Sequence, residues 1–384
     1  MSLFGGTTFG GARPLGGATG STFGSTTPSA PAASSTAGSS AEKDIEISQP
    51  PTDGVSSLSW SPTADFLAAS CWDNNVRIYG IESNGSSAPK ASYAHQGPVL
   101  DVTWSKDGNK ILSCGADKAA RLYDVTSGQQ QQVAAHDAPI RNLRWIDQNG
   151  GILATGSWDK TVKYWDLRSP QPIATAQLAE RCYSMDFAWP YLIVACAERK
   201  IQVFDLSQNP SNAIMTIDSP LKWQTRCVAA FQRQDPPGSP IPPPGYAVGS
   251  VEGRVAIQYI KEENKNLNFS FKCHRKDGPT ARDPQQLYPV NAISFHPIHG
   301  TFSTAGGDGG LSFWDKDSKT RLKTFESKPA PISCTAFNRN GTIFAYAASY
   351  DWHKGWQGAP APNTPQNIYL HGCKDEEVKR RPKK

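Results

Sequence analysis

Short stretches in which apolar and polar residues alternate recur along most of this chain, and the clearest set lies between residues 136 and 168. In that stretch IRNLRW alternates, ILATGS is mostly apolar, and TVKYWDL alternates again, so the pattern predicts three short strands. Turn-forming residues separate the strands, around residues 147–151 and at 158–160. Because three strands alone leave a sheet face unburied, the pattern also predicts neighbouring units of the same kind.

The same unit recurs seven times. An aromatic residue closes the last strand of each copy, at intervals of roughly 40 to 55 residues. These residues are Tyr79, Tyr123, Trp165, Phe204, Tyr259, Trp314 and Tyr369. A turn with an acidic residue precedes that strand, as in GADK, GSWD and GGDG. The spacing and the Trp-Asp ending are typical of WD repeats, each of which supplies a four-stranded blade. We therefore predict an all-β fold, a seven-bladed WD-repeat β-propeller.

The two ends of the chain suggest how the ring closes. The seventh repeat has no outer strand after Tyr369, whereas the strand-like stretch DIEIS precedes the first repeat. We expect this N-terminal strand to complete the last blade, because pairing of the chain ends leaves no open seam.

These patterns also divide the chain into parts. The predicted domains are a leader over residues 1–41, the propeller over 42–373 and a basic C-terminal tail over 374–384. Two long loops, 235–245 and 352–366, receive no role.

Composition sets the two terminal segments apart from the propeller. Residues 1–41 are rich in Gly, Ser, Thr and Ala, so we expect disorder there. Their three Phe-Gly dipeptides, at residues 4, 9 and 23, are either incidental in a flexible leader or part of a segment like those of nucleoporins, and the composition favours the second reading. Residues 374–384 hold six basic and three acidic residues, within a net charge of +5 for the whole chain. The propeller itself is nearly neutral, so affinity for nucleic acid must come from local patches and the tail.

The eight cysteines include no C-x-x-C pair, and several lie inside strand patterns, which indicates free thiols in a reducing compartment. No apolar run is long enough to span a bilayer, so no membrane partner is predicted. The pairs Cys273-His274 and His296/His299 lack further ligands at zinc spacing. We therefore predict neither a metal site nor a cofactor.

His136, Ser157 and Asp159 have the composition of a catalytic triad. In WD repeats, however, these three residue types and the closing tryptophan, here Trp165, form a buried and hydrogen-bonded structural tetrad. The second repeat holds a degraded copy, His95, Ser113, Asp117 and Tyr123. A catalytic nucleophile is needed at one site only, so an incomplete second copy of the same set of residues indicates a structural role. Because the chain also lacks a phosphate loop, we predict that it is not an enzyme.

Two groups of residues remain as candidates for binding. Trp72 and Trp158 lie on loops between second and third strands, which share one face in propellers. Each either packs on its own blade or contacts a partner. Arg254 follows the corresponding turn of the fifth repeat, and Arg226 lies on the adjacent inner strand. Two arginines beside exposed tryptophans suit the carboxylates of an acidic peptide.

The second group lies around FWDKDSKTRLKTF in the sixth repeat. Basic residues interleaved with aromatic ones suit single-stranded nucleic acid, through phosphate neutralisation and base stacking. The alternative is an ordinary solvated turn in which the tryptophan is the buried aromatic of the repeat. The residues are Phe271, Trp314, Lys316, Lys319, Arg321 and Lys323.

Several longer stretches resemble one group of WD-repeat proteins. They are GSWDKTVKYWDLR, LKWQTRC, SVEGRVAIQY, FKCHR, YPVNAISFHPIHGTF and FAYAASYDW. The group includes nuclear-pore mRNA export factors, which bind the GLEBS motif of a Gly-Leu-Phe-Gly nucleoporin. It also includes mitotic-checkpoint proteins, which bind GLEBS motifs of checkpoint kinases. SYDWHKG, the Phe-Gly leader and the basic end KRRPKK resemble the export factors more closely.

The resemblance implies a non-enzymatic adaptor at the nuclear pore, in the nuclear envelope and with shuttling to the cytoplasm. This adaptor would bind a nucleoporin GLEBS hairpin and single-stranded RNA or messenger ribonucleoprotein, as a monomeric propeller in a heterodimer. The alternative is a spindle-checkpoint scaffold.

The resemblance also implies roles for particular residues. Those at the GLEBS surface would be Trp72, Arg226 and Arg254, with Trp158 on the same face. A groove for RNA, which viral proteins that mimic RNA also exploit, would map to Arg254, Phe271, Trp314, Lys316, Lys319 and Arg321, with Lys323 beside them. Arg254 therefore has two candidate roles.

Overall fold

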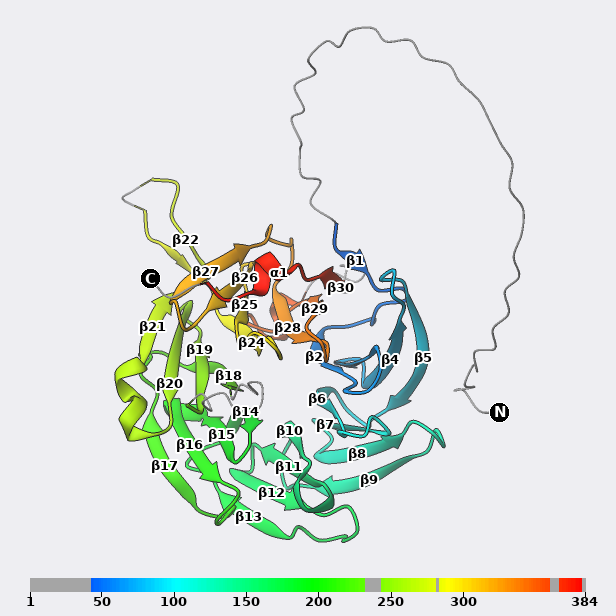
Figure 1. Ribbon diagram of the computed structural model, residues 1–384. Helices are drawn as coiled ribbons and strands as arrows, with labels where there is room; N and C mark the ends of the chain where they lie inside the picture. Colours follow the sequence, from blue (N-terminus) through cyan, green and yellow to red (C-terminus); the bar gives the residue numbers. More distant parts are fainter. Residues whose placement is uncertain (1–42, 232–242, 281–282, 360–365, 382–384) are drawn as a thin grey trace, which may run out of the picture. The chain divides into compact units, whose positions relative to one another are not determined.

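The computed structural model describes residues 43–231, 243–280, 283–359 and 366–381. The predicted leader, residues 1–41 with its Phe-Gly dipeptides, lies outside the described residues, as does most of loop 235–245. From Asp44 onward the chain forms one compact unit. In this unit, seven four-stranded antiparallel sheets surround a central axis (Figure 1). The prediction of an all-β, seven-bladed propeller is confirmed.

In blades one to six the four strands run outward from the axis in chain order, and the first three strands of blade seven do the same. The inner strands are β2 (Val55–Trp60), β6 (Val99–Trp104), β10 (Ile140–Ile146), β14 (Cys182–Ala188), β18 (Thr225–Phe231), β24 (Val290–Phe295) and β28 (Ile332–Phe337). The second strands are β3 (Phe66–Cys71), β7 (Lys110–Gly115), β11 (Ile152–Ser157), β15 (Tyr191–Cys196), β19 (Gly245–Ser250), β25 (Phe302–Gly306) and β29 (Ile343–Ala348). The third strands are β4 (Asn75–Ile81), β8 (Ala119–Asp124), β12 (Thr161–Trp165), β16 (Lys200–Asp205), β20 (Arg254–Tyr259), β26 (Leu311–Asp315) and β30 (Asn367–Gly372).

The outer strands of blades one to six are β5 (Ser87–Ala94), β9 (Gln130–Ala135), β13 (Ala174–Gln177), β17 (Ala213–Asp218), β21 (Phe269–Lys272) and β27 (Thr320–Thr324). A short hairpin that the sequence pattern does not predict, β22 (Arg275–Lys276) with β23 (Gln286–Leu287), separates blades five and six. The helical elements are α1 (Asp375–Val378) and the 3-10 turns η1 (Gln148–Gly150), η2 (Ala197–Arg199), η3 (Glu262–Leu267) and η4 (Trp356–Gly358). None of the described helices is long and apolar enough to cross a membrane.

The second strands explain why one strand of each repeat reads as a continuous apolar run. In β11, Leu153 packs in a core shared with blade two, while the next residue, Ala154, packs in a core shared with blade four. Both side chains are fully buried. Neighbouring blades cover both faces of the strand, so the side chains on both faces are apolar. The strand therefore shows no alternation of apolar and polar residues.

The N-terminal strand closes the ring as predicted. Strand β1 (Ile45–Glu46) pairs antiparallel with β30, so that Ile45 lies opposite Leu370. The backbone N–H of Ile47 donates to the carbonyl of Ile368 at 2.9 Å, and the Ile47 side chain is buried between blades seven and one. The fourth strand of blade seven therefore comes from the opposite end of the chain, and it covers the outer edge of β30.

One backbone hydrogen bond repeats in all seven blades and defines what we call the upper face. The residue after each second strand donates its N–H to a carbonyl that precedes the inner strand of the same blade, as Trp158 does to Pro139 at 3.0 Å. The donors in the other blades are Trp72, Ala116, Ala197, Val251, Gly307 and Ser349. The turns between second and third strands therefore all lie on this one face.

Residues 374–381, the described part of the predicted basic tail, pack on the propeller. Val378 of α1 is buried, and its carbonyl accepts a hydrogen bond from the Thr301 hydroxyl at 2.7 Å. Farther along, Arg380 lies 3.6 Å from Asp317, and the Arg381 N–H donates to Asp315 at 3.1 Å. The guanidinium of Arg380 and the backbone of Arg381 thus lie against blade six.

Both ends of the propeller meet at one histidine. His371 Nδ1 lies 2.8 Å from Asp44 Oδ1, just before β1, and its Nε2 lies 2.9 Å from Glu377 Oε2 in α1. Burial by itself lowers the pKa of His371, but the contacts with Asp44 and Glu377 outweigh burial and raise that pKa overall. Burial raises the pKa of Asp44, and its hydrogen bonds to His371 and Tyr346 outweigh this and lower it.

We therefore predict that closure of the ring weakens in mild alkali. A histidine whose pKa is raised by folding stabilises the fold fully below its unfolded pKa of about 6.5, and this contribution is lost as the pH rises through the folded pKa. In His371→Asn, the melting temperature should therefore fall less between pH 6 and pH 8.5 than it does in the wild-type protein. Equal pH slopes for the two proteins would contradict this role of His371.

Candidate partner-binding surfaces

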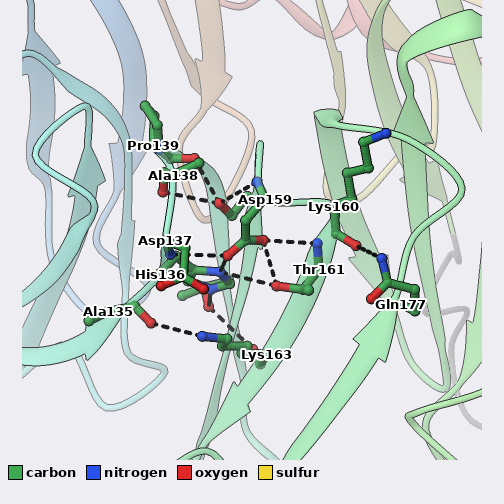
Figure 2. Close-up of polar contacts among 12 residues, drawn as sticks. Ala135, His136, Asp137, Ala138, Pro139, Asp159, Lys160, Thr161, Lys163 and Gln177 are labelled. Carbon is green, nitrogen blue, oxygen red and sulfur yellow. Dashed lines mark hydrogen bonds and ion pairs between the residues drawn. The ribbon is translucent and has the colours of Figure 1, made fainter.

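The structural tetrad of blade three is present, but its hydroxyl group comes from a different residue than predicted. Figure 2 shows His136 beside Asp159, with His136 Nδ1 2.8 Å from Asp159 Oδ2. The other ring nitrogen of His136, Nε2, lies 2.8 Å from Thr155 Oγ1. The Trp165 indole N–H donates to the same Thr155 oxygen at 2.8 Å. Burial is the main cause that lowers the pKa of His136, which favours the neutral ring at neutral pH. The tetrad therefore ties together the loop before the blade, its second strand and its third strand.

The prediction that Ser157 belongs to this tetrad was wrong. Its hydroxyl contacts the carbonyls of Ala138 and Pro139 at 3.1 and 3.0 Å and accepts the N–H of Asp159 at 3.1 Å. Thr155 and Ser157 lie two residues apart on β11, so strand alternation places them on the same face. The imidazole of His136 bonds to the hydroxyl of Thr155 and not to that of Ser157 at the end of the strand. The spacing of residues in the sequence does not show which of the two hydroxyls the ring contacts.

Blade six holds a complete second tetrad that the sequence analysis missed. His274 Nδ1 lies 2.9 Å from Asp308 Oδ1, its Nε2 lies 3.0 Å from Thr304 Oγ1, and Trp314 donates its indole N–H to Thr304 at 2.9 Å. The GGDGG turn and the Trp-Asp ending indicated a tetrad in this blade. The histidine was harder to find, because the hairpin β22–β23 separates His274 from the rest of its blade in the sequence. His274 is therefore a tetrad residue, and the described residues contain no cluster that could hold a metal ion.

The degraded tetrad of blade two also differs from expectation. His95 contacts Ser113 Oγ at 2.7 Å and Asp117 at 3.1 Å, as predicted. The fourth member, however, is Tyr93, whose hydroxyl lies 2.8 Å from Ser113, whereas Tyr123 stacks on the Tyr93 ring at 4.9 Å. An outer-strand phenol thus takes the position of the missing indole.

We predict that Thr155→Val destabilises the propeller more than Ser157→Ala does. The valine would leave the buried His136 nitrogen and the Trp165 N–H without a partner, at a cost of about 1–3 kcal/mol for each. Ser157→Ala removes contacts near the upper surface and should cost about 1 kcal/mol. Chemical denaturation of both variants measures the difference, with Thr155→Ser as the control that keeps the hydroxyl. A larger loss in Ser157→Ala would contradict the assignment.

The predicted tryptophans of the upper face differ in exposure. Trp72 stacks on Trp352 at a centroid distance of 4.3 Å, so it packs against the loop of blade seven. Trp158 is 39% exposed. The most exposed tryptophan near this face outside blade seven is Trp223, at 62%, in the segment before β18. It was missed because it lies between repeats, although LKWQTRC contains it.

Arg226 and Arg254 are held differently. Arg226 donates to the side-chain oxygen of Asn291 at 3.1 Å and to the carbonyl of Asp351 at 2.8 Å. It makes no ion pair with a described carboxylate within 4 Å. Arg254 lies at the start of β20, 3.7 Å from Glu252 in the preceding turn. Both arginines are half-buried and lie on or near the upper face.

Arg254 and Phe271, predicted to share one groove, are directed to opposite faces of blade five. Arg254 lies opposite Lys272 in the sheet, whereas its neighbour Val255 lies opposite Phe271. Val255 and Phe271 pack in the core between blades five and six, together with Trp314. Because successive residues of a strand face opposite sides, Arg254 is directed toward blade four. This geometry favours the upper-face role of Arg254 over the groove role.

Five residues do form an aromatic and basic surface on the outer side of blades five and six, which we call the blade-six cluster. Phe271 contacts Trp314 at a centroid distance of 4.5 Å. Lys319 lies 4.9 Å from the ring centre of Phe269, and Arg321 lies 5.7 Å from that of Trp314. Neither base makes an ion pair with a described residue. Phe269, which the sequence analysis did not single out, completes the cluster.

The other two predicted bases are already engaged. Lys316 is only 9% exposed and lies 2.7 Å from Asp317. Lys323 lies 3.1 Å from Glu377 in α1 and 5.9 Å from the Phe325 ring, in the direction of blade seven. The structure therefore brings together Phe271, Trp314, Lys319 and Arg321, and separates Lys316 and Lys323 from them.

Comparison with known proteins agrees with this architecture. Residues 45–80, 88–124 and 128–166 match the family described as WD domain, G-beta repeat. A Schizosaccharomyces pombe protein named Poly(A)+ RNA export protein is 53% identical over 345 residues, covering 89% of this chain and 94% of that protein. Proteins named mRNA export factor from Xenopus tropicalis and Pongo abelii are 47% and 45% identical, each over 89% of this chain and 92% of the relative.

The fold and the tetrads thus define a WD-repeat β-propeller. With relatives this similar over nearly their whole length, the chain belongs to the family of WD-repeat mRNA export factors.

Proposed function

We propose that this protein is a non-enzymatic adaptor in the export of messenger RNA, which joins a nucleoporin to ribonucleoprotein at the nuclear pore. The names of the relatives, which refer to RNA export, support this reading over that of a spindle-checkpoint scaffold. The observation that supports the proposal is that one closed propeller carries two separate surfaces with the composition of binding sites. One is the upper face with its exposed tryptophans, and the other is the blade-six cluster.

The upper face would bind the GLEBS hairpin of a Gly-Leu-Phe-Gly nucleoporin. Trp158 and Trp223 offer large apolar contacts, while Arg254 and Arg226 offer positive charge to glutamates of the hairpin. Trp72 contributes through its stack with Trp352. A monomeric propeller would thus form a heterodimer with the nucleoporin and localise to the nuclear envelope, with shuttling to the cytoplasm.

We predict that Arg254→Glu weakens binding of a GLEBS peptide by tenfold or more, because removal of one well-placed charged contact costs about 2 kcal/mol. Isothermal titration calorimetry measures the affinity. Lys90→Glu, on the exposed outer strand of blade one, is the matched charge reversal away from the upper face. Unchanged affinity in Arg254→Glu with a normal melting temperature would remove Arg254 from the peptide surface.

The blade-six cluster would bind single-stranded RNA, or a viral protein that mimics it. Lys319 and Arg321 neutralise phosphates, and the rings of Phe269, Phe271 and Trp314 offer surfaces on which bases stack. The indole N–H of Trp314 is used inside the tetrad, so its contribution to RNA would be the ring face and edge alone. Because the indole is fixed from within, the stacking surface is rigid before RNA arrives.

We predict that Lys319→Glu/Arg321→Glu lowers RNA affinity and reduces the slope of log affinity against log salt by about 1.4, the value for two phosphate contacts on a single strand. Fluorescence anisotropy with oligouridylate at several salt concentrations gives the slope. Lys323→Glu should change it little, because Lys323 is paired with Glu377. An unchanged slope in the double variant, combined with loss of binding when residues 382–384 are removed, would assign RNA to the tail.

A further inference from the structure

One position of the inner strands is aromatic in nearly every blade. Each inner strand begins at the upper face and ends at the opposite face of the propeller, which we call the lower face. The sixth residue of every inner strand pairs with the first or second residue of the second strand, near the lower face. This residue is aromatic in six blades and alanine in blade five. In blade order the residues are Trp60, Trp104, Trp145, Phe187, Ala230, Phe295 and Phe337.

In blades one and two, the aromatic residue at this position serves the fold itself. Trp60 donates its indole N–H to the carbonyl of Ala336 in blade seven at 3.1 Å. Trp104 donates in the same way to the carbonyl of Ser59 in blade one at 3.0 Å. Both tryptophans are buried. Each of them therefore joins its own blade to the blade before it.

The series changes in blades three, four and five. Trp145 is half-buried, and its indole N–H bonds to no residue that the structure describes. Among the described residues, the buried polar atoms without a partner do not include this nitrogen, so it is open to solvent. Phe187 has no donor, and Ala230 has no ring. On this side of the axis the position therefore leaves both an unused donor and unfilled space.

A cavity of about 650 Å³ lies at the lower face beside these residues. This volume is in the range of ligand sites, about 300–1,000 Å³. Ala230 lines the cavity at the place where six other blades carry a ring. Trp189 is 37% exposed, and its ring meets that of Phe187 edge-on at a centroid distance of 6.4 Å. The aromatic residues of the lining are Trp60, Trp104, Trp145, Phe187 and Trp189.

The ring of Trp145 is held in place by the turn that follows its strand. A Cβ atom at Gly151 would collide with the six-membered ring of Trp145. Gly151 also has a φ of 95°, in the left-handed region that favours glycine. The close approach restricts the indole in the free protein, and a side chain that is already ordered loses little entropy when a ligand binds.

The cavity offers no net charge to a ligand. Lys106 and Asp147 are the two charged residues of its described lining. Their side chains lie 3.1 Å apart, and both are exposed. Because the two charges offset each other in contact with water, a charged ligand would gain little here. The composition therefore favours an uncharged ligand.

The unused polar groups of the lining can donate hydrogen bonds. The indole N–H groups of Trp145 and Trp189 bond to no described residue, and an indole can only donate. The hydroxyls of Ser59 and Thr103 also bond to no described residue, and each carries one further donor. A ligand that presents carbonyl oxygens and few N–H groups matches this set.

We propose that this lower-face cavity binds an uncharged, proline-rich segment of a partner protein. Proline has no backbone N–H to satisfy, and a polyproline II helix exposes its carbonyls to the surroundings. Such helices dock in grooves lined by aromatic residues. Proline rings would pack on Trp145 and Trp189, whose N–H groups donate to the carbonyls of the segment. The site is separate from the upper face and the blade-six cluster and does not rest on the proposed export function.

The test titrates fluorescein-labelled decaproline with the full chain and follows fluorescence anisotropy. We expect saturable binding of decaproline and none of a labelled glycine-serine repeat of equal length. Trp145→Phe keeps a ring but removes the N–H, so it should weaken binding about fivefold, the value of one neutral hydrogen bond. Ala230→Phe should abolish binding, because it places in the cavity the ring that six other blades carry. Melting temperatures confirm that both variants are folded.

Trp356→Phe is the matched control for the tryptophan substitution. Trp356 is 77% exposed and does not line the cavity, so its replacement should leave the affinity for decaproline unchanged. The affinity should also stay constant between low and high salt, because the ligand is uncharged. Oligouridylate should not displace decaproline, since the blade-six cluster lies elsewhere on the propeller.

Three results would overturn the proposal. The first is an absence of decaproline binding to the wild-type protein. The second is wild-type affinity in both Trp145→Phe and Ala230→Phe. The third is equal binding of the glycine-serine peptide, which would show that the cavity does not recognise proline. None of these results bears on binding of the GLEBS peptide or of RNA, so the two proposals can fail separately.

Discussion

No blade of this propeller can bury its own faces, and this constraint governs the rest of the structure. A four-stranded sheet has two apolar faces, and here each face is covered by the next blade around the axis, as Leu153 and Ala154 show on the two sides of β11. Such an arrangement is satisfied only if the ring closes. Closure therefore falls to the two-residue strand β1 and to the contacts of His371 with Asp44 and Glu377, which hold both ends of the propeller.

Crowding seven inner strands around one axis creates a second constraint, because polar groups near the axis have limited access to water. Buried polar and charged groups need partners. Most find them between blades, as in the chain from Asp101 through Arg144 to Asp186, which links blades two, three and four. Farther out, the tetrads of blades three and six serve the same purpose. Histidine, aspartate and hydroxyl side chains that suggest chemistry are thus accounted for by packing.

Groups left without such partners mark the surfaces available to other molecules. On the upper face these are exposed tryptophans and arginines without firm ion pairs, and on the outer side of blades five and six they are Lys319 and Arg321 above aromatic rings. The indole of Trp314 links the two roles, since its N–H is fixed inside the tetrad while its ring packs against Phe271. The tetrad of the repeat therefore also fixes one ring of the blade-six cluster.

The sequence by itself determined the number of blades, the strand order within each and the closing strand. These features depend on local periodicity and on a repeat pattern that is visible in all seven copies. It also carried the family, through motifs such as SVEGRVAIQY. Only the tertiary structure decided which hydroxyl completes the tetrad, since Thr155 and Ser157 share a face of one strand and only the reach of His136 distinguishes them. It also decided that Arg254 and Phe271 face opposite sides of blade five, and that Lys316 and Lys323 are already paired. These outcomes depend on register and on contacts between distant blades, and a linear pattern contains neither.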